Sequence, residues 1–159
     1  MGWTIRRAQD SDVGFLREML LEAATWRPGN RATEKIDVLA DPHVTRYLAE
    51  WGRPGDTALL ALDEQGEPAG AAWFRFFSKD EPAYGFIDET IPELSIAVRA
   101  DIRGRGIATG LLKALVRAAR EQGVRALSLS VEEDNPALRL YERIAFRSVS
   151  FRAGSSSRA

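Results

Sequence analysis

The sequence predicts an α/β protein with a mixed, mostly antiparallel sheet and helices on both faces. Three observations lead to this fold class. Short apolar runs alternate with longer segments of helical spacing in the order β-α-α-β-β-β-α-β-α-β. The stretch DEQGEP at 63–68 joins two apolar runs and predicts a hairpin. A strand, helix, strand unit in the second half predicts one parallel crossover.

The chain is expected to open with a strand followed by a helix. Residues 3–8 (WTIRRA) have strand character, and residues 10–25 have apolar side chains at helical spacing. These apolar residues are Val13, Leu16, Leu20 and Ala23. Asp10 or Ser11 is suited to cap the helix. A strand and a helix therefore form the first unit of the fold.

A second, broken helical region is expected over 32–40 and 41–52. In its second piece Asp41 is placed to cap the helix and Pro42 takes the first helical position. Gly52 is expected to end the helix, because glycine readily leaves the helical conformation. The two pieces together would cover one end of the molecule.

The remaining elements follow the same patterns. Strands are expected at 57–62, 70–77, 91–98, 125–131 and 147–151, and helices within 99–123 and over 135–146. Asn135 would cap the last helix, with Pro136 in its first turn. The closing residues AGSSSRA have the composition of a frayed tail.

Composition restricts the class of protein. The 159 residues, 17.6 kDa, are expected to form a single domain (1–159), and a net charge of −1 argues against nucleic acid as the main partner. No apolar run is long enough to cross a membrane. The sequence has no cysteine and one histidine, His43, so the usual zinc sets are missing and no metal is expected. The first residues lack a signal-peptide core, which favours the cytoplasm.

The segment RGRGIA at 103–108 has the features of an anion site. The core-facing stripe of the helix begins just after Gly106, so Gly104 and Gly106 lie at the helix start. A helix start exposes unpaired N–H groups, and glycine allows a ligand to approach them. Arg103 and Arg105 add positive charge suited to phosphate. The alternative is a simple strand-to-helix turn with solvated arginines. The Walker loop and the dinucleotide fingerprint do not fit the spacing.

The same segment resembles the [Q/R]-x-x-G-x-[G/A] signature of the GNAT superfamily of acyl-CoA-dependent N-acyltransferases, with Arg103, Gly106 and Ala108 in the defining positions. ELSIAV before it and LSLSVEEDNPALRLYERIAF after it are similar to that family's fourth strand, fifth strand and fourth helix. The resemblance covers 93–151 closely. It implies the GNAT fold and acetyl-CoA as the cosubstrate.

The resemblance also implies a binding site for acetyl-CoA. Backbone amides at the helix start, with Thr109, would hold the pyrophosphate. The pantetheine would pair with the edge of the fourth strand, and the N–H of Val98 would serve as an oxyanion donor. Asn135 would either bind pantetheine or act as a helix cap alone. The residues implied for this site are Ile96, Ala97, Val98, Arg103, Gly104, Arg105, Gly106, Ile107, Ala108, Thr109 and Asn135.

Acyl transfer to an amine needs a base and an acid. By resemblance, Tyr141 is the acid that protonates the departing thiolate, the alternative being a buried aromatic. Glu93 is the candidate base, on the strand face opposite Leu94, although an acidic residue at a strand start is usually solvated. Asp88, Glu89 or water are the alternatives.

Two departures from the family's pattern stand out. Ala145 replaces a glycine common in that family, which affects stability more than function. The chain also ends soon after residue 151, where the family has a seventh strand. That strand is either missing or supplied by a partner chain, so a homodimer is considered.

The acceptor is expected to be an amine of a small molecule or a protein. Aromatic residues that line its site or belong to the core are Trp26, Tyr47, Trp51, Phe76, Phe77, Tyr84 and Phe86. The acidic segment 79–93 favours a cationic amine. Three hypotheses follow: an acetyl-CoA-dependent N-acetyltransferase, a non-catalytic acetyl-CoA-binding regulatory module, and a nucleotide-phosphate binder of another fold.

Overall fold

The computed structural model of the chain describes residues 2–24, 40–131, 141, 148–152 and 155–158. Its strands are β1 (Thr4–Arg7), β2 (Thr57–Leu62), β3 (Pro68–Arg75), β4 (Glu93–Val98), β5 (Leu129–Val131), β6 (Ser148–Arg152) and β7 (Ser155–Arg158). Its helices are α1 (Val13–Ala24), α3 (Pro42–Thr45) and α4 (Ile107–Glu121), with 3₁₀ turns at Asp10–Asp12 and Ala100–Ile102. The predicted order is confirmed as far as β5, apart from the helical piece expected at 32–40, of which 32–39 lie outside the described residues. The helix expected at 135–146 also lies outside them, except for Tyr141.

The strands form two sheets in the described part of the chain. β1, β2, β3 and β4 make an antiparallel sheet in that order, and β5, β7 and β6 make a second one. A single parallel bridge between Glu93 and Ser128 links the two sheets, with Leu94 N donating to Ser128 O at 2.8 Å. The predicted crossover is confirmed, because α4 lies between β4 and β5 in the chain and the bridge is parallel.

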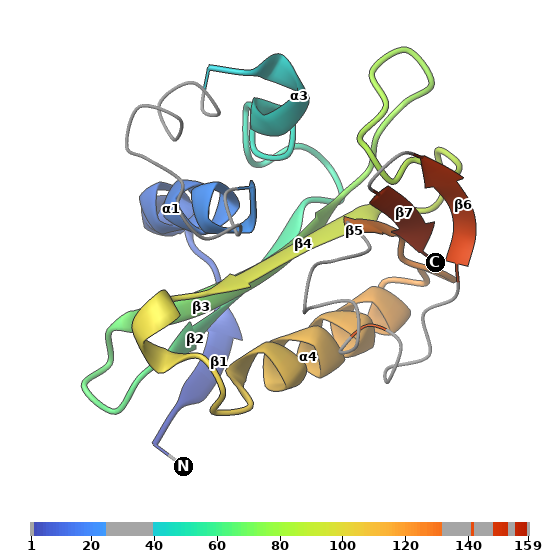
Figure 1. Cartoon of the computed structure of the whole chain (residues 1–159). Helices are drawn as coiled ribbons and strands as arrows, with labels where there is room; N and C mark the ends of the chain where they lie inside the picture. Colours follow the sequence, from blue (N-terminus) through green and yellow to red (C-terminus); the bar gives the residue numbers. More distant parts are fainter. Residues whose placement is uncertain (1, 25–39, 132–140, 142–147, 153–154, 159) are drawn as a thin grey trace.

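Helices cover both faces of the first sheet, as predicted. Figure 1 shows α1 and α3 on one face and α4 on the other. The side of α4 that faces the sheet is fully apolar and buries Ile107, Leu111, Leu112, Leu115 and Ala119. On the opposite face, Leu16, Met19 and Leu20 of α1 pack with Tyr47 and Trp73. Each such leucine contributes roughly 2 kcal/mol by burial, so both helices are fixed by their apolar stripes.

The start of the first helix differs from the prediction. Residues 10–12 form a 3₁₀ turn capped by Gln9, so neither Asp10 nor Ser11 is the cap. Asp12 accepts a hydrogen bond from Gln9 N at 2.7 Å and a two-pronged ion pair from Arg6. The carboxylate three residues into the turn therefore closes the capping box.

The helix expected at 41–52 is shorter than predicted. Asp41 does cap it, accepting from His43 N at 2.9 Å, and Pro42 is in the first turn. The helix ends at Thr45, and the chain continues in turns to Gly52, whose φ of 111° requires glycine. In the same region, the strand expected at 70–77 ends at Arg75.

The prediction that the closing residues AGSSSRA form a frayed tail is wrong. Ser155–Arg158 forms β7, which pairs antiparallel with both β5 and β6. The seventh strand therefore comes from this chain itself and needs no partner subunit. Its run of three serines has no apolar alternation, and backbone pairing does not depend on side-chain type, so the pattern could not reveal it. Among the described residues, no helix is long and apolar enough to cross a membrane.

Candidate active site at the split between β4 and β5

The two sheets separate along β4, which leaves one of its edges open. Leu94 N donates to the O of Ser128, the residue just before β5, whereas Arg99 N, five residues on, donates to Ala69 O on the other side at 2.8 Å. Backbone N–H groups alternate between the two edges of a strand. The N–H groups of Ile96 and Val98 therefore face the open edge with that of Leu94, and no described strand pairs with them.

Of the three strand residues predicted to bind the ligand, two present polar groups to the gap. Ala97 lies opposite Ala71 and directs its backbone toward β3. Val98 O accepts a hydrogen bond from Arg103 Nε at 3.2 Å, which confirms that this residue faces the gap. The backbone groups that face outward on this edge thus belong to Ile96 and Val98.

The glycines at the start of α4 are required by backbone geometry. Gly104 and Gly106 have φ of 83° and 81°, a left-handed region that side chains disfavour. A Cβ at either position would meet no atom within 4 Å, so the space beside this backbone is open. Gly106 caps the helix, and the first intrahelical bond runs from Gly110 N to Gly106 O at 3.0 Å. The N–H groups of residues 107–109 precede that bond and can serve an anion.

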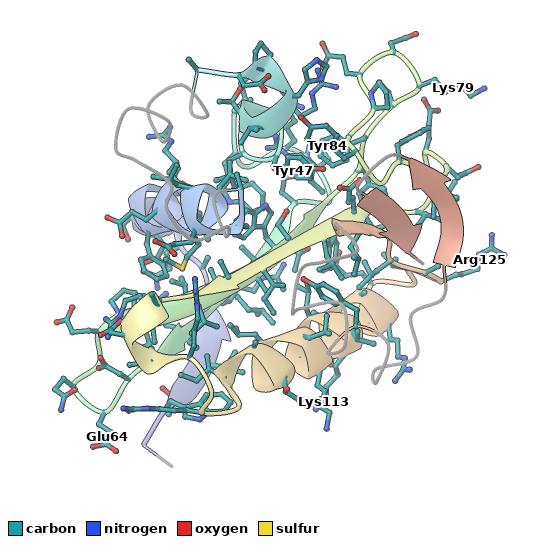
Figure 2. The ribbon with its side chains drawn as sticks, in the orientation of Figure 1. Tyr47, Glu64, Lys79, Tyr84, Lys113 and Arg125 are labelled. Atoms are coloured by element: carbon teal, nitrogen blue, oxygen red, sulfur yellow. The ribbon has the colours of Figure 1, made fainter. Side chains whose placement is uncertain are left out.

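The two arginines of this segment have different surroundings. Arg103 forms an ion pair with Glu22 of α1 at 3.0 Å, with 51% and 32% of the two side chains exposed. Arg105 is exposed and lines a hollow of about 500 Å³ together with Arg99 and Ile107. Figure 2 places Glu64, another lining residue, on the β2–β3 hairpin beside this end of the sheet. Sequence reasoning missed both Glu22 and Arg99, because each lies outside the glycine segment.

At the other end of the split, Glu93 is buried, with only 2% of the residue exposed. The expectation of a solvated carboxylate is therefore wrong. Its Oε2 accepts a hydrogen bond from the Tyr47 hydroxyl, and its Oε1 accepts one from Gly85 N at 2.8 Å. Burial raises the pKa of Glu93 to about 7, against the lowering effect of those two bonds. A carboxylate of this kind can take up and release a proton near neutral pH.

The two alternative carboxylates, Asp88 and Glu89, form hydrogen bonds within the loop that precedes β4. Asp88 accepts two bonds from Thr90, at 2.7 Å to N and 2.6 Å to Oγ1, and these bonds lower the pKa of the carboxyl. Glu89 accepts a bond from Lys79 N at 3.0 Å. Both residues are exposed. Neither has the environment of Glu93.

The candidate acid, Tyr141, is buried in the core cluster that includes α4. Its burial raises the pKa of the phenol, so the hydroxyl keeps its proton at neutral pH. That is the protonation state required of an acid. Asn135 lies outside the described residues.

The aromatic residues considered for the acceptor have several roles. Trp51 lies under the Arg75 guanidinium at 5.3 Å, and Phe77 meets the Tyr47 ring edge-on at 5.4 Å. Figure 2 shows Tyr47 and Tyr84 close together below α3, and Tyr84 is 51% exposed. Phe86 is half-buried, and Trp26 lies outside the described residues. The sequence could not separate these environments.

A second hollow lies on the same side of the sheet as Phe77. It has a volume of about 400 Å³. The side chains that line it include Arg46, Arg53, Phe76, Phe77, Glu81 and Glu89. Within the described ranges, no group of three or more His, Cys, Asp or Glu is placed to hold a metal ion.

Comparison with known proteins gives one family and one fold. The model of the acetyltransferase (GNAT) family matches residues 17–146. A mycothiol acetyltransferase of Corynebacterium aurimucosum is 34% identical over 104 residues, 62% of this chain and 32% of that protein. An L-methionine sulfoximine/L-methionine sulfone acetyltransferase of Pseudomonas aeruginosa is 34% identical over 95 residues, 59% of this chain and 52% of that protein. The chain thus spans between a third and about half of the length of these relatives.

Solved structures agree on the fold. The PaiA N-acetyltransferase of Thermoplasma acidophilum, in complex with coenzyme A, superposes with a TM-score of 0.72 at 14% identity and covers 99% of this chain and 98% of that one. A phosphinothricin acetyltransferase of Sinorhizobium meliloti, in complex with acetyl-CoA, has a TM-score of 0.66 at 20% identity, with 99% and 87% covered. At these identities the likeness establishes the architecture.

Proposed function

Because this chain belongs to the GNAT acetyltransferase family, we propose that it is an acetyl-CoA-dependent N-acetyltransferase that transfers the acetyl group directly to a primary amine. The observation that carries the proposal is the split between β4 and β5. It joins an anion-binding helix start at one end to a buried carboxylate with a pKa of about 7 at the other. Donor binding and proton removal therefore have separate sites at the two ends of the same gap.

The helix start would hold the donor's pyrophosphate. Gly104 and Gly106 leave the backbone accessible, and the amides of Arg103–Ala108 together with Thr109 would supply the hydrogen bonds. Arg105 and Arg103 would add charge, the latter by exchanging Glu22 for phosphate. The nucleotide binder of another fold is no longer needed as a hypothesis, since the fold is that of the GNAT family.

The open edge of β4 would hold the pantetheine arm and the thioester. Ile96 and Val98 offer the backbone groups for this pairing, and Asn135 is proposed to bind the same arm. Val98 N–H would donate to the thioester oxygen as negative charge develops on it. This donor is fixed by the strand, so it would stabilise the tetrahedral intermediate without rearrangement.

The proposed chemistry uses two side chains, Glu93 as the base and Tyr141 as the acid. Glu93 takes a proton from the ammonium form of the acceptor, directly or through water, and the neutral nitrogen attacks the thioester carbon. The new C–N bond forms and the C–S bond breaks as Tyr141 gives its proton to the departing sulfur. The second proton lost by the nitrogen returns to the Tyr141 oxygen, directly or through water, and Glu93 releases its proton to solvent. The products are an amide and coenzyme A.

The acceptor is proposed to be a primary amine of a small molecule or a protein. The names of the relatives, mycothiol acetyltransferase and methionine sulfoximine acetyltransferase, support the small-molecule class. No nucleic-acid or membrane partner is proposed. We propose a cytoplasmic location, and keep a homodimer as the state to be checked by sedimentation.

The test is an amine panel with acetyl-CoA, read by release of the thiol, together with calorimetry of coenzyme A binding. We expect turnover with at least one amine and a loss of roughly 10²- to 10⁴-fold in kcat for Tyr141→Phe and for Glu93→Gln. Binding of coenzyme A without thiol release from any amine would favour the non-catalytic regulatory module. Absence of coenzyme A binding would refute both.

A further inference from the structure

The candidate base is closed off by protein groups. Both carboxylate oxygens of Glu93 have a donor, and Glu93 and Tyr47 expose only 2% and 7% of their surfaces. An acceptor amine in the gap would therefore meet a carboxylate whose position and charge are set by its neighbours. The neighbour that contributes a side chain is Tyr47.

We propose that Tyr47 is the positioning residue for Glu93: its hydroxyl fixes the orientation of the carboxylate and stabilises the charged form that accepts the proton. The inference rests on the proposed function, in which Glu93 is the base. Nothing in the sequence pattern connects the two residues, which lie 46 positions apart.

The direction of the hydrogen bonds supports this role. The Tyr47 hydroxyl oxygen accepts from Tyr84 N at 3.1 Å, and a backbone N–H can only donate. The phenol has one proton, and this proton is directed at Glu93 Oε2. Gly85 N donates to the other oxygen. Two donors thus converge on one carboxylate, an arrangement that favours its ionised form.

The position of Tyr47 is fixed by the strand pair that carries Glu93. Arg75 lies directly opposite Glu93 in the β3–β4 register. Its Nη1 donates to Arg46 O at 2.9 Å and to Ala49 O at 2.6 Å, on either side of Tyr47 in the chain. Phe77 packs edge-on against the Tyr47 ring. These contacts hold the turn after α3 in place, so that the Tyr47 hydroxyl reaches Glu93 at the start of β4.

The other groups around Glu93 do not replace this contact. The Arg75 guanidinium shares the sheet face but is paired with Asp56. From the loop before β4, the hydrogen bond to the carboxylate comes from the backbone N–H of Gly85. Ser128, just before β5, forms the parallel bridge with Glu93, and its buried hydroxyl has no hydrogen-bond partner among the described residues. Loss of the Tyr47 hydroxyl would leave Gly85 N as the one donor, so the pKa of Glu93 would rise.

The experiment compares Tyr47→Phe with Tyr84→Phe, the same change in a neighbouring tyrosine whose hydroxyl does not contact Glu93. The acid limb of kcat/KM against pH is expected near pH 7 in the parent protein. Tyr47→Phe should move this limb up by about one to two pH units, the size expected for a hydrogen bond to a charged group. Tyr84→Phe should leave its midpoint in place. Calorimetry of coenzyme A binding checks that both variants are folded.

A second measurement does not depend on turnover. Carbon-13 NMR of labelled glutamate carboxyls, with Glu93 assigned through Glu93→Gln, follows its titration in the parent and in Tyr47→Phe. The same upward shift is expected there. An unchanged Glu93 titration, or an equal loss of kcat/KM at every pH with the limb unmoved, would overturn the proposal and leave Tyr47 a packing residue. Absence of turnover with a shifted titration would instead count against the proposed function alone.

Discussion

Arg75 and Asp56 form a bidentate ion pair in the interior of the protein. Nε and Nη2 of the guanidinium lie 3.0 and 2.8 Å from the two carboxylate oxygens, and the side chains are 1% and 2% exposed. Asp56 also accepts bonds from Gly52 N and Arg53 N. The pair therefore fastens the turns after α3 to β3, and with them Tyr47.

Asp56→Asn should destabilise the protein strongly. It leaves a buried guanidinium without its counter-charge, which costs about 3–5 kcal/mol. The measurement is the free energy of unfolding in urea. Glu50→Gln is the control, since it breaks the exposed Arg53–Glu50 pair and should cost less than about 1 kcal/mol. If the two variants lost similar free energy of unfolding, the buried pair would contribute no more to stability than the exposed one.

Glu93 should make stability depend on pH. Its pKa is about 7 in the folded protein and about 4.5 when exposed, so the folded state binds an extra proton between these values. Its contribution is complete below pH 4.5 and is lost as the pH rises through 7, on the order of 3 kcal/mol in all.

The comparison that isolates this effect is the parent against Glu93→Gln, by urea unfolding at a series of pH values. The stability of the parent relative to the variant should fall across that window. Asp12, whose pKa is lowered by Arg6, acts in the opposite direction but is common to both proteins. A difference that stays constant with pH would contradict the assignment.

Gly106→Ala should weaken binding of coenzyme A. The added methyl lies at the proposed phosphate site and strains a φ of 81°. Gly123→Ala is a matched control, because Gly123 follows the other end of α4 with a φ of 78° and equally open surroundings. Both should lose similar stability, roughly 1 kcal/mol. Calorimetry should show a raised Kd only for Gly106→Ala, and equal effects on Kd would argue against the site.

Gly110→Ala should be destabilising although alanine is the better helix former. A Cβ at Gly110 would overlap the end of the Trp3 indole, and overpacking costs about 1–3 kcal/mol. Gly14→Ala in α1 meets no atom within 4 Å and should gain up to about 1 kcal/mol. In a Trp3→Ala background, Gly110→Ala should become stabilising too. If it remains harmful there, the contact with Trp3 is not the cause.

Much of the fold could be predicted because its elements are periodic or punctuated. Local sequence preferences agree with the final structure at three places: the apolar stripe of α4, the DEQGEP turn and the Asp41–Pro42 helix start. β7 could not be predicted, since its serines carry no pattern and its stability comes from pairing with β5 and β6.

The site was predictable to a different degree at its two ends. Gly104 and Gly106 indicate a left-handed backbone conformation that few other residues adopt, so the helix start could be located from the sequence. Glu93 could be proposed from its place at the start of β4, but its hydrogen bonds come from Tyr47 and Gly85, which lie in other segments of the chain. The sequence does not indicate which group a tyrosine hydroxyl will contact. Tyr47 could therefore be named only among the aromatic residues of the acceptor site or the core.

The open edge of β4 has a consequence for the protein without its donor. Ile96 and Val98 present backbone groups that no described strand satisfies, and such an edge is a template for pairing with another chain. A pantetheine arm lying there would act as a removable strand. A bound donor would then prevent self-association through this edge. The protein should therefore stay monodisperse at higher protein concentrations when acetyl-CoA is present.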